Sequence, residues 1–368
     1  MVEKFHDITF DHGTHDKLKL FKASLSRWLV VVINDRYFEG PIQIFDLFSG
    51  PGCDVDGTSG SPLIICELIA GNSTRLLKSG KKVVIIFNDS NVKKIKELQE
   101  RLSSFDFNGV SVKIQYFGES FKSVINELLP QMRIKNSFNY VFLDQFGVTE
   151  VNGDLFKIMC SIPRVDLLFF MATSFLKRFA NTGCFSEVDF IDMKKLLKLP
   201  SHLVHRAVAE DFSKLVPTGQ EYYMAPFSLK KGPNLYGLIF GSSHIKGLRQ
   251  FNEACWKVSQ LIGDANWITE EEKHLESEQL SLFEDANRPN RLNAFERDLE
   301  CAIISKELTN NREIYLFTIT KGFMPKHAKD VWKNMVNSKK VVNVKRFPIN
   351  DDVWKKHKEL VSIELCHE

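Results

Sequence analysis

The sequence predicts a Rossmann-like α/β domain, whose mostly parallel sheet ends in an antiparallel hairpin, followed by a small winged-helix-like α+β unit. Three observations predict this fold class. Strand-like and helical segments alternate between residues 42 and 171, which is typical of a parallel sheet covered by helices on both faces. Two later strand-like runs flank a polar turn at 230–234, which indicates a hairpin. The chain of 368 residues is long enough for two domains.

Hydrophobic periodicity predicts the elements of the first domain. Leu18, Phe21 and Leu25 repeat at the spacing of an amphipathic helix, and Thr14 is a candidate N-cap for that helix. Short apolar runs predict strands that are buried on both faces of the sheet. Strands are expected at 42–48, 82–87, 112–116, 140–143, 166–171, 221–229 and 235–240, with helices at 61–77, 92–102, 124–132 and 244–261.

The remaining chain divides into a connector and a second domain. We expect residues 1–262 to form the Rossmann domain, 263–292 an acidic connector and 293–368 the winged-helix-like domain. In the last domain the pattern predicts helices near 294–305 and 325–335, with strands at 314–318 and 341–347. Residues 264–285 carry eight acids and one Lys, a net charge of −7, while 321–358 carry eleven Lys or Arg and three Asp, a net charge of +8. The charge of either segment is also explained if that segment simply forms a solvent-exposed face.

Composition narrows the class of protein. Hydrophobic residues make up 43% and charged residues 26% of the chain, which includes 30 Phe, so we expect a folded globular protein. The seven Cys include no CxxC pair, which argues against a structural zinc site and favours reduced thiols in a cytoplasmic protein. The N-terminal residues show no signal-peptide pattern, and no apolar run reaches the roughly 18 residues that a membrane span needs, so no membrane association is expected.

A glycine-rich turn after the first strand is the sharpest chemical signal. It occupies 45–52, with Asp46, Phe48, Gly50 and Gly52 as its candidate binding residues. Glycines at the end of a parallel strand let the backbone turn tightly and approach a ligand. The Asp46 carboxylate could hold a cationic amino group or a water beside that turn. The alternative is a plain strand-to-helix turn with an incidental acid.

Acidic residues follow the second and third strands. Asp89 stands where an acid accepts hydrogen bonds from both hydroxyls of a ribose. It lies 37 residues after Gly52 rather than the usual 20 or so, because the stretch 53–61 intervenes. The alternative role for Asp89 is a helix N-cap. Glu119 and Ser120 stand where an adenine edge could be contacted, or where they could cap the following helix.

The fourth strand ends in Asp144, Gln145, Phe146 and Gly147. This position resembles that of enzymes which methylate amino groups of nucleic acids, and the resemblance implies that Asp144 would grip the target amine and Phe146 would stack on the base as candidate catalytic residues; a purely structural role is the alternative. No Pro-Cys pair follows this strand, so a covalent mechanism with a Cys nucleophile is not expected. Metal ligation has no His or Cys spacing to support it.

Taken together, these residues resemble class I S-adenosylmethionine-dependent methyltransferases, whose sheets also end in an antiparallel hairpin. The resemblance implies S-adenosylmethionine as the cofactor, with its methionine part in the loop at 45–52, its ribose at Asp89 and its adenine at Glu119. In related enzymes that methylate amino groups of nucleic acids, the fourth strand ends in Asn/Asp-Pro-Pro-Tyr/Phe. Here Gln145 stands where a Pro is usual.

A set of motifs also resembles the three-Cys-motif partner protein family over nearly the whole chain. The matching residues are His15-Asp16-Lys17, Asp46-Leu47-Phe48-Ser49-Gly50-Pro51-Gly52, Gly57-Thr58-Ser59-Gly60-Ser61-Pro62-Leu63, Phe142-Leu143-Asp144-Gln145-Phe146-Gly147, Ser243-His244-Ile245-Lys246-Gly247-Leu248 and Trp256-Lys257. This bacterial family resembles a methyltransferase fold with an added C-terminal domain. The resemblance implies a three-cysteine, radical-S-adenosylmethionine-like partner protein and a setting in phage defence or mobile elements.

Three hypotheses follow from the sequence. The first is a methyltransferase that acts on nucleic acid, DNA or RNA, with the basic segment 321–358 gripping phosphates. The second is a non-catalytic scaffold that binds DNA or a partner protein. The third is a nuclease with metal ions on Asp46, Asp89 and Asp144, which the glycine-rich loop makes less favoured.

Overall fold

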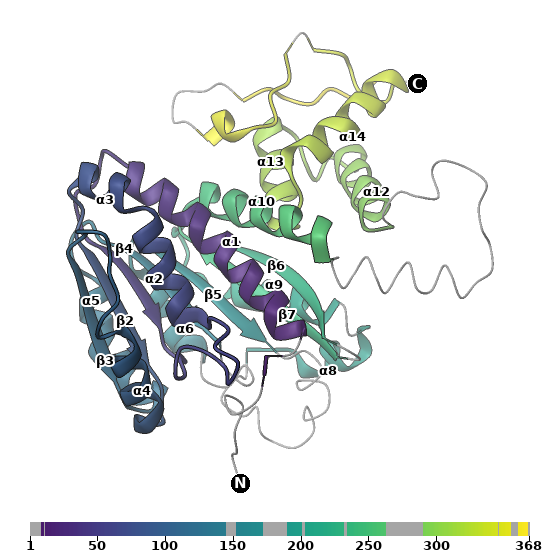
Figure 1. Cartoon of the computed structure of the whole chain (residues 1–368). Coiled ribbons are helices and arrows are strands. Elements are labelled where there is room, and N and C mark those ends of the chain that lie inside the picture. The colour runs from purple at the N-terminus through teal and green to yellow at the C-terminus, as the bar shows by residue number, and fades with distance from the viewer. Residues whose placement is uncertain are drawn as a thin grey trace. The chain divides into compact units, whose positions relative to one another are not determined.

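The computed structural model describes residues 9–10, 12–144, 152–171, 190–200, 203–231, 234–262, 290–344, 346–354 and 360–366 (Figure 1). The chain divides into two compact units, Met1–Ile262 and Gly263–Glu368. Each unit is described by itself. Most of the expected acidic connector, 263–289, lies outside the described residues.

The first unit is built on a seven-stranded sheet with the order β3-β2-β1-β4-β5-β7-β6. Its strands are β1 (Ile42–Asp46), β2 (Val83–Asn88), β3 (Val112–Phe117), β4 (Phe138–Leu143), β5 (Val165–Met171), β6 (Tyr223–Lys231) and β7 (Asn234–Ser242). Strands β1 to β5 are parallel, whereas β7 runs antiparallel to both β5 and β6. This is the strand order of class I methyltransferases, with the terminal hairpin folded back so that β7 lies inside β6. The predicted sheet is therefore confirmed.

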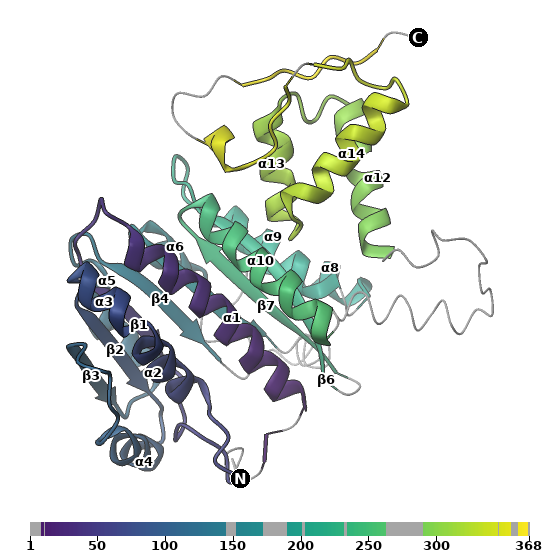
Figure 2. The same cartoon turned by 45° about the horizontal axis from the view of Figure 1, so that its top comes forward.

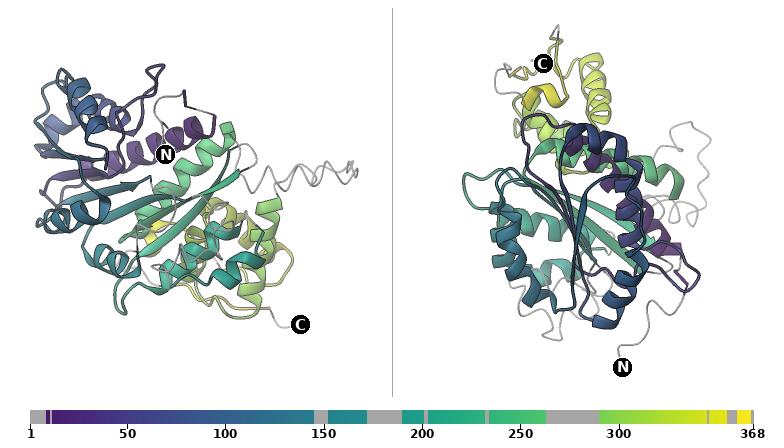
Figure 3. Two further views of the ribbon diagram at one scale, coloured as in Figure 1. Left: turned by 90° about the horizontal axis from the view of Figure 1, so that it is seen from below. Right: turned by 60° about the vertical axis from the view of Figure 1, so that its left-hand side comes forward.

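Helices cover both faces of this sheet (Figures 2 and 3). On one face α1 (His12–Asn34) packs along α10 (Ile245–Ile262) and against α2 (Ser61–Gly71) and α3 (Ser73–Ser79), while α4 (Val92–Leu102) packs by β3. The other face is covered by α5 (Phe121–Met132), α6 (Gly153–Ser161), α8 (Met193–Lys198) and α9 (Val204–Lys214). None of the described helices is long and apolar enough to cross a lipid bilayer.

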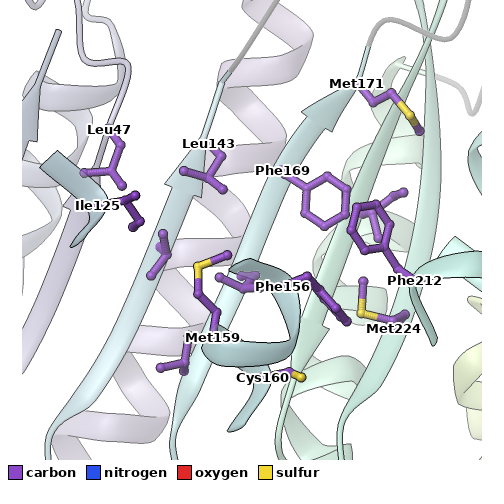
Figure 4. Close-up of a cluster of buried hydrophobic side chains, with 14 of the residues drawn as sticks. Leu47, Ile125, Leu143, Phe156, Met159, Cys160, Phe169, Met171, Phe212 and Met224 are labelled. Atoms are coloured by element: carbon purple, nitrogen blue, oxygen red, sulfur yellow. The ribbon is translucent and has the colours of Figure 1, made fainter. Parts of the chain in front are cut away.

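Alternation along the strands decides which side chains meet which helices, because successive residues point to opposite faces. On β4, Tyr140 and Phe142 face α1, where the ring of Phe21 lies 4.3 Å from the ring of Phe142. Val141 and Leu143 point the other way, into the hydrophobic cluster under α5 and α6 (Figure 4). Side chains at the next even position, just beyond the strand, therefore point toward α1.

Several predicted boundaries of the first unit are corrected by local hydrogen bonds. Thr14 is not an N-cap, because α1 already begins at His12. The helix expected at 61–77 is two helices that meet at Asn72, whose side chain donates to the carbonyl of Leu68. Helices α6, α8 and α9 are absent from the sequence prediction. Helices α6 and α8 are short, whereas α9 carries a signal that could have located it, because the buried residues Val204, Val208 and Phe212 recur at helical spacing.

The second unit contains three described helices, α12 (Asn290–Ile304), α13 (Asn311–Thr320) and α14 (Pro325–Asn337), and a short 3-10 helix, η3 (Asp351–Trp354). The strand expected at 314–318 is wrong, because these residues lie inside α13. Their β-branched and aromatic side chains favour a strand. The side chain of Asn310 overrides that preference by accepting hydrogen bonds from the N–H groups of Arg312 and Glu313, which starts a helix.

Isolated β-bridges replace the longer strand that was expected after α14. Val341 pairs with Leu365, and Asn310 pairs with Ser362, so the segment 360–366 lies between the chain before α13 and the chain after α14. The strand predicted at 341–347 is therefore reduced to one bridge. The resulting order is helix, short β, helix, helix and two short β segments, which is that of a winged helix, as the sequence predicts.

Candidate active site

The loop after β1 adopts conformations that require its glycines. Gly50 has a φ of 63° and Gly52 a φ of 97°, in the left-handed region that side chains disfavour. A Cβ at Gly52 would also lie 2.8 Å from Cδ1 of Leu98 on α4. The N–H of Ser49 donates to the carbonyl of Asn88 at 2.8 Å, which ties the loop to the end of β2. The two predicted glycines thus shape the loop at 45–52.

Asn88 links the ends of three adjacent strands, a role that sequence reasoning did not assign to it. Its amide nitrogen donates to the carbonyls of Leu47 and Glu119 at 3.2 and 3.1 Å, and its amide oxygen accepts the N–H of Glu119 at 3.1 Å. The side chain is buried. An amide at the carboxyl end of an otherwise apolar strand is the signal that could have identified it.

Asp89 lies beside the glycine loop. One carboxylate oxygen accepts the N–H of Gly50 at 3.1 Å, and the other accepts the N–H of Asn91 at 2.8 Å. The N-cap of α4 is Asn91, which accepts the N–H of Lys93. The structure therefore removes the alternative that Asp89 caps the helix and brings its carboxylate to the loop at 45–52.

Glu119 and Phe48 lie on the rim of the same region. Glu119 is exposed and accepts a hydrogen bond from the hydroxyl of Ser123 at 2.5 Å. Its neighbour Ser120 is the N-cap of α5, so the capping role falls to Ser120. The ring of Phe48 stacks on Phe121 with 5.5 Å between centroids. Phe48 thus anchors the loop to the α5 side of the sheet.

Asp46 is the most unusual group in the site. It is fully buried, and neither of its carboxylate oxygens has a hydrogen-bond partner among the described residues. Burial raises the pKa of Asp46 from 3.8 to about 7. The nearby Ser61 hydroxyl and Phe48 N–H lower the pKa in part, though neither has the geometry of a hydrogen bond. The negative charges of Asp144 and Asp89 raise the pKa further.

Asp144, at the end of β4, points toward α1 and away from the hydrophobic cluster under α5 and α6. Its carboxylate accepts a hydrogen bond from the ammonium of Lys17 on α1 at 2.5 Å. Asp46 and Asp144 lie on the same face of neighbouring strands, because Asp46 pairs with Phe142 in the β1–β4 register. The other candidate catalytic residue, Phe146, lies outside the described residues, as do Gln145 and Gly147.

The stretch 53–60, which lengthens the spacing between Gly52 and Asp89, is an ordered loop held by Asp54. The Asp54 carboxylate accepts N–H groups from Phe10 at 2.8 Å, Asp56 at 3.1 Å and Thr58 at 2.7 Å. Burial alone would raise the pKa of Asp54, but these hydrogen bonds outweigh it and lower the pKa. Asp54 therefore fastens the segment before α1 to the site, a role that sequence reasoning missed.

The carboxylates do not converge on a metal position. Asp89 is held by two N–H groups and Asp144 by Lys17. Within the part of the chain that the structure describes, no group of three His, Cys, Asp or Glu residues could hold a metal ion. None of the six described cysteines forms a disulfide bond with another described residue, and Cys184 lies outside the described residues.

Comparison with known proteins supplies one domain match and several distant structural likenesses. The model of the GMT-like wHTH domain family matches residues 268–346. No curated protein matches the chain.

Three solved structures illustrate the likenesses. An S-adenosylmethionine-dependent methyltransferase from Agrobacterium tumefaciens has a TM-score of 0.32 at 12% identity, over 59% of this chain and 60% of that one. The magnesium protoporphyrin IX methyltransferase of Synechocystis, solved with bound SAH, has a TM-score of 0.32 at 9% identity, over 64% and 89%. The cyclopropane synthase MmaA2 of Mycobacterium tuberculosis has a TM-score of 0.28 at 12% identity, over 67% and 70%.

The chain thus spans less than two thirds of the Agrobacterium structure. At TM-scores near 0.3 these likenesses carry no argument about activity. The fold assignment rests on the strand order and on the matched winged-helix domain.

Proposed function

We propose that the protein is an S-adenosylmethionine-dependent methyltransferase that acts on nucleic acid. One observation carries the proposal: a fully buried carboxylate without a partner, Asp46, lies next to the left-handed glycine turn at Gly50 and Gly52. A buried charge of this kind is unfavourable unless a cation neutralises it. The α-amino group of S-adenosylmethionine is such a cation, so the residues present fit this cofactor.

Each part of the cofactor has a candidate residue. Asp46 faces the amino group, and the loop from Phe48 to Gly52 surrounds the methionine part. Asp89, oriented by the Gly50 N–H, accepts the two ribose hydroxyls. Glu119, exposed at the end of β3, is positioned for the adenine edge. The bound cofactor supplies a methyl group on a sulfonium, which an acceptor nucleophile takes up in line.

The acceptor side of the proposal rests on Asp144 and Phe146 at the end of β4, where they would grip and stack the target base. In the second unit, three lysines of α14, Lys326, Lys329 and Lys333, are exposed and recur at helical spacing. They would contact phosphates, which positions a duplex without reading its sequence. The match to the GMT-like wHTH domain supports a nucleic-acid role for this unit.

A three-cysteine partner protein remains part of the proposal on the strength of the sequence motifs alone. Co-purification of this chain with a co-expressed three-cysteine protein, compared with the same protein lacking its cysteines, tests that association. A complex that forms equally well without the cysteines would contradict the specific pairing.

Isothermal titration with S-adenosylmethionine tests the proposed cofactor. The wild-type protein should bind, while Asp46→Asn and Asp89→Ala should each weaken binding on the order of tenfold or more, because each removes a charge-assisted hydrogen bond. Asp154→Asn is a matched control, since its side chain is 90% exposed on α6, and it should bind normally. Failure of the wild-type protein to bind would overturn the proposal.

The second candidate is a non-catalytic scaffold, and the complete burial of Asp46 is the observation that favours it. A carboxyl that no ligand reaches would serve only the core, and it would be protonated only below its raised pKa of about 7. Under this candidate the titration gives no heat, and duplex DNA binding depends on the three α14 lysines alone.

A further inference from the structure

Four elements bring polar and aromatic side chains together at the carboxyl edge of β4 and β5. The ammonium of Lys17 on α1 lies 2.5 Å from the carboxylate of Asp144 and 4.8 Å above the ring centre of Phe170 on β5. The other neighbour of Phe170 is Tyr236 on β7, whose ring stacks on it with centroids 5.1 Å apart and an interplanar angle of 17°. The Lys17 side chain is only 13% exposed.

Phe170 positions the ammonium and does not offer a free stacking surface. One ring neighbour is Tyr236, and the ammonium of Lys17 lies over the ring as well. A cation within about 6 Å of the centre of an aromatic ring is attracted to the face of that ring. The stack therefore holds the Lys17 ammonium beside Asp144.

The pair has hydrogen-bonding capacity left over. An ammonium has three donors and a carboxylate about four acceptor positions. Among the described residues, Asp144 is the one acceptor within hydrogen-bond distance of the Lys17 ammonium, and Lys17 is the one donor to Asp144. A donor and an acceptor with unused capacity thus stand side by side at the strand edge where the acceptor substrate is proposed to enter.

We propose that Lys17 is a specificity-determining residue, and that the Lys17–Asp144 pair selects a nucleobase with an exocyclic amine next to a ring nitrogen acceptor. This inference rests on the proposed methyltransferase function and names its acceptor class. Adenine and cytosine both carry that edge, whereas thymine presents no exocyclic amine. Asp144 accepts an N–H of the amine, and Lys17 donates to the adjacent ring nitrogen.

Bonds, electrons and the proton are all accounted for when the methyl group is transferred to an amine held in this way. The lone pair of the amine nitrogen forms the new N–C bond while the S–C bond of the sulfonium breaks, and that electron pair returns to sulfur as a neutral thioether. The nitrogen then releases one proton, which passes through the Asp144 carboxylate to water. Lys17 keeps the base oriented during transfer and remains an ammonium throughout.

The test compares wild type, Lys17→Met and Lys17→Arg with single-stranded oligodeoxyadenylate, oligodeoxycytidylate and oligodeoxythymidylate as acceptors. Initial rates of methyl transfer give kcat and KM, and titration gives the affinity for S-adenosylmethionine. Lys19→Met is the matched control, because Lys19 lies on the same helix with a 59% exposed side chain. Thermal unfolding of each variant identifies any loss of folding.

Wild type should methylate the adenine or cytosine oligonucleotide and not the thymine one. Lys17→Met should raise KM and lower kcat/KM roughly 10- to 100-fold with little change in cofactor affinity, as expected for loss of a charge-assisted hydrogen bond. Lys17→Arg should restore much of the loss, and Lys19→Met should behave as wild type. The inference is overturned if wild type binds the cofactor but methylates none of these acceptors, or if Lys17→Met retains full kcat/KM. Absence of cofactor binding would instead overturn the proposed function on which it rests.

Discussion

Replacing Asp46 by Asn should stabilise the protein without cofactor, and should do so more strongly as the pH rises. The pKa of Asp46 is raised from 3.8 to about 7 mainly by burial. An acid whose pKa is raised in the folded state binds more protons there than in the unfolded chain, so wild-type stability falls as pH rises from about 4 to about 7. The shift of about 3 pKa units corresponds to about 4 kcal/mol at most, at 1.36 kcal/mol per unit. The neutral amide of Asn escapes this penalty.

The pH dependence isolates the charge effect from other consequences of the substitution. Linkage gives a penalty of about 1.7 kcal/mol at pH 5 and about 4 kcal/mol at pH 8 for wild type. The stability difference between Asp46→Asn and wild type should therefore grow by about 2 to 3 kcal/mol between these two pH values. A buried amide with no partner has its own desolvation penalty of about 1 to 3 kcal/mol, but that penalty does not change with pH.

Urea unfolding of both proteins at pH 5 and pH 8, followed by circular dichroism, measures this growth. Saturating S-adenosylmethionine should narrow the stability difference, because at 100 times its Kd a ligand stabilises the wild type by about 2.7 kcal/mol, while a variant that binds tenfold more weakly gains only about 1.4 kcal/mol. A stability difference that is the same at both pH values would refute the assignment of a buried, raised-pKa carboxylate.

Three further predictions follow. Cofactor binding at pH 7 should release about half a proton from Asp46, because its pKa of about 7 leaves it half protonated; titration in buffers of different ionisation enthalpy measures this, and equal heats in all buffers would contradict it. Changing Lys326, Lys329 and Lys333 to Gln should lower the salt dependence of duplex DNA binding by about 2 to 3 in log–log slope, as fluorescence anisotropy would show, without altering cofactor affinity. Asn88→Ala should destabilise the protein by about 2 to 3 kcal/mol in urea unfolding, since it removes the hydrogen-bond partner of the Glu119 N–H and of two carbonyls; a loss below about 0.5 kcal/mol would argue against that link.

The parts of the fold that sequence predicts are those governed by local pattern. Apolar runs followed by glycine turns locate β1 and the loop at 45–52, because burial on both faces and a left-handed turn each leave a direct trace in residue type. The strand expected at 314–318 is wrong because two local signals conflict there. Its residue types favour β structure, but the side chain of Asn310, a polar residue that lies outside the apolar pattern, caps and starts a helix.

The contacts that sequence does not predict join distant parts of the chain. Lys17 and Asp144 are 127 positions apart and meet because α1 runs along one face of the sheet with its first turns at the carboxyl end of β4. From the sequence, Asp54 is an ordinary polar loop residue. In the structure its carboxylate accepts a hydrogen bond from the N–H of Phe10, which is 44 positions away. Residue type marks a carboxylate as a candidate, but its partner decides what it does.

That distinction separates the two carboxylates of the site. Asp46 and Asp144 lie on the same face of adjacent strand ends, yet among the described residues Asp144 already has a cation in Lys17 and Asp46 has none. A small cation that enters the site is therefore drawn to Asp46, and a neutral hydrogen-bonding edge is better matched to the Lys17–Asp144 pair. A metal-dependent nuclease would need its carboxylates to share one ion, and here the ammonium of Lys17 already occupies the Asp144 carboxylate. The charge arrangement thus favours one cationic ligand and one neutral acceptor, which is the pair of substrates that sulfonium-based methyl transfer to a base requires.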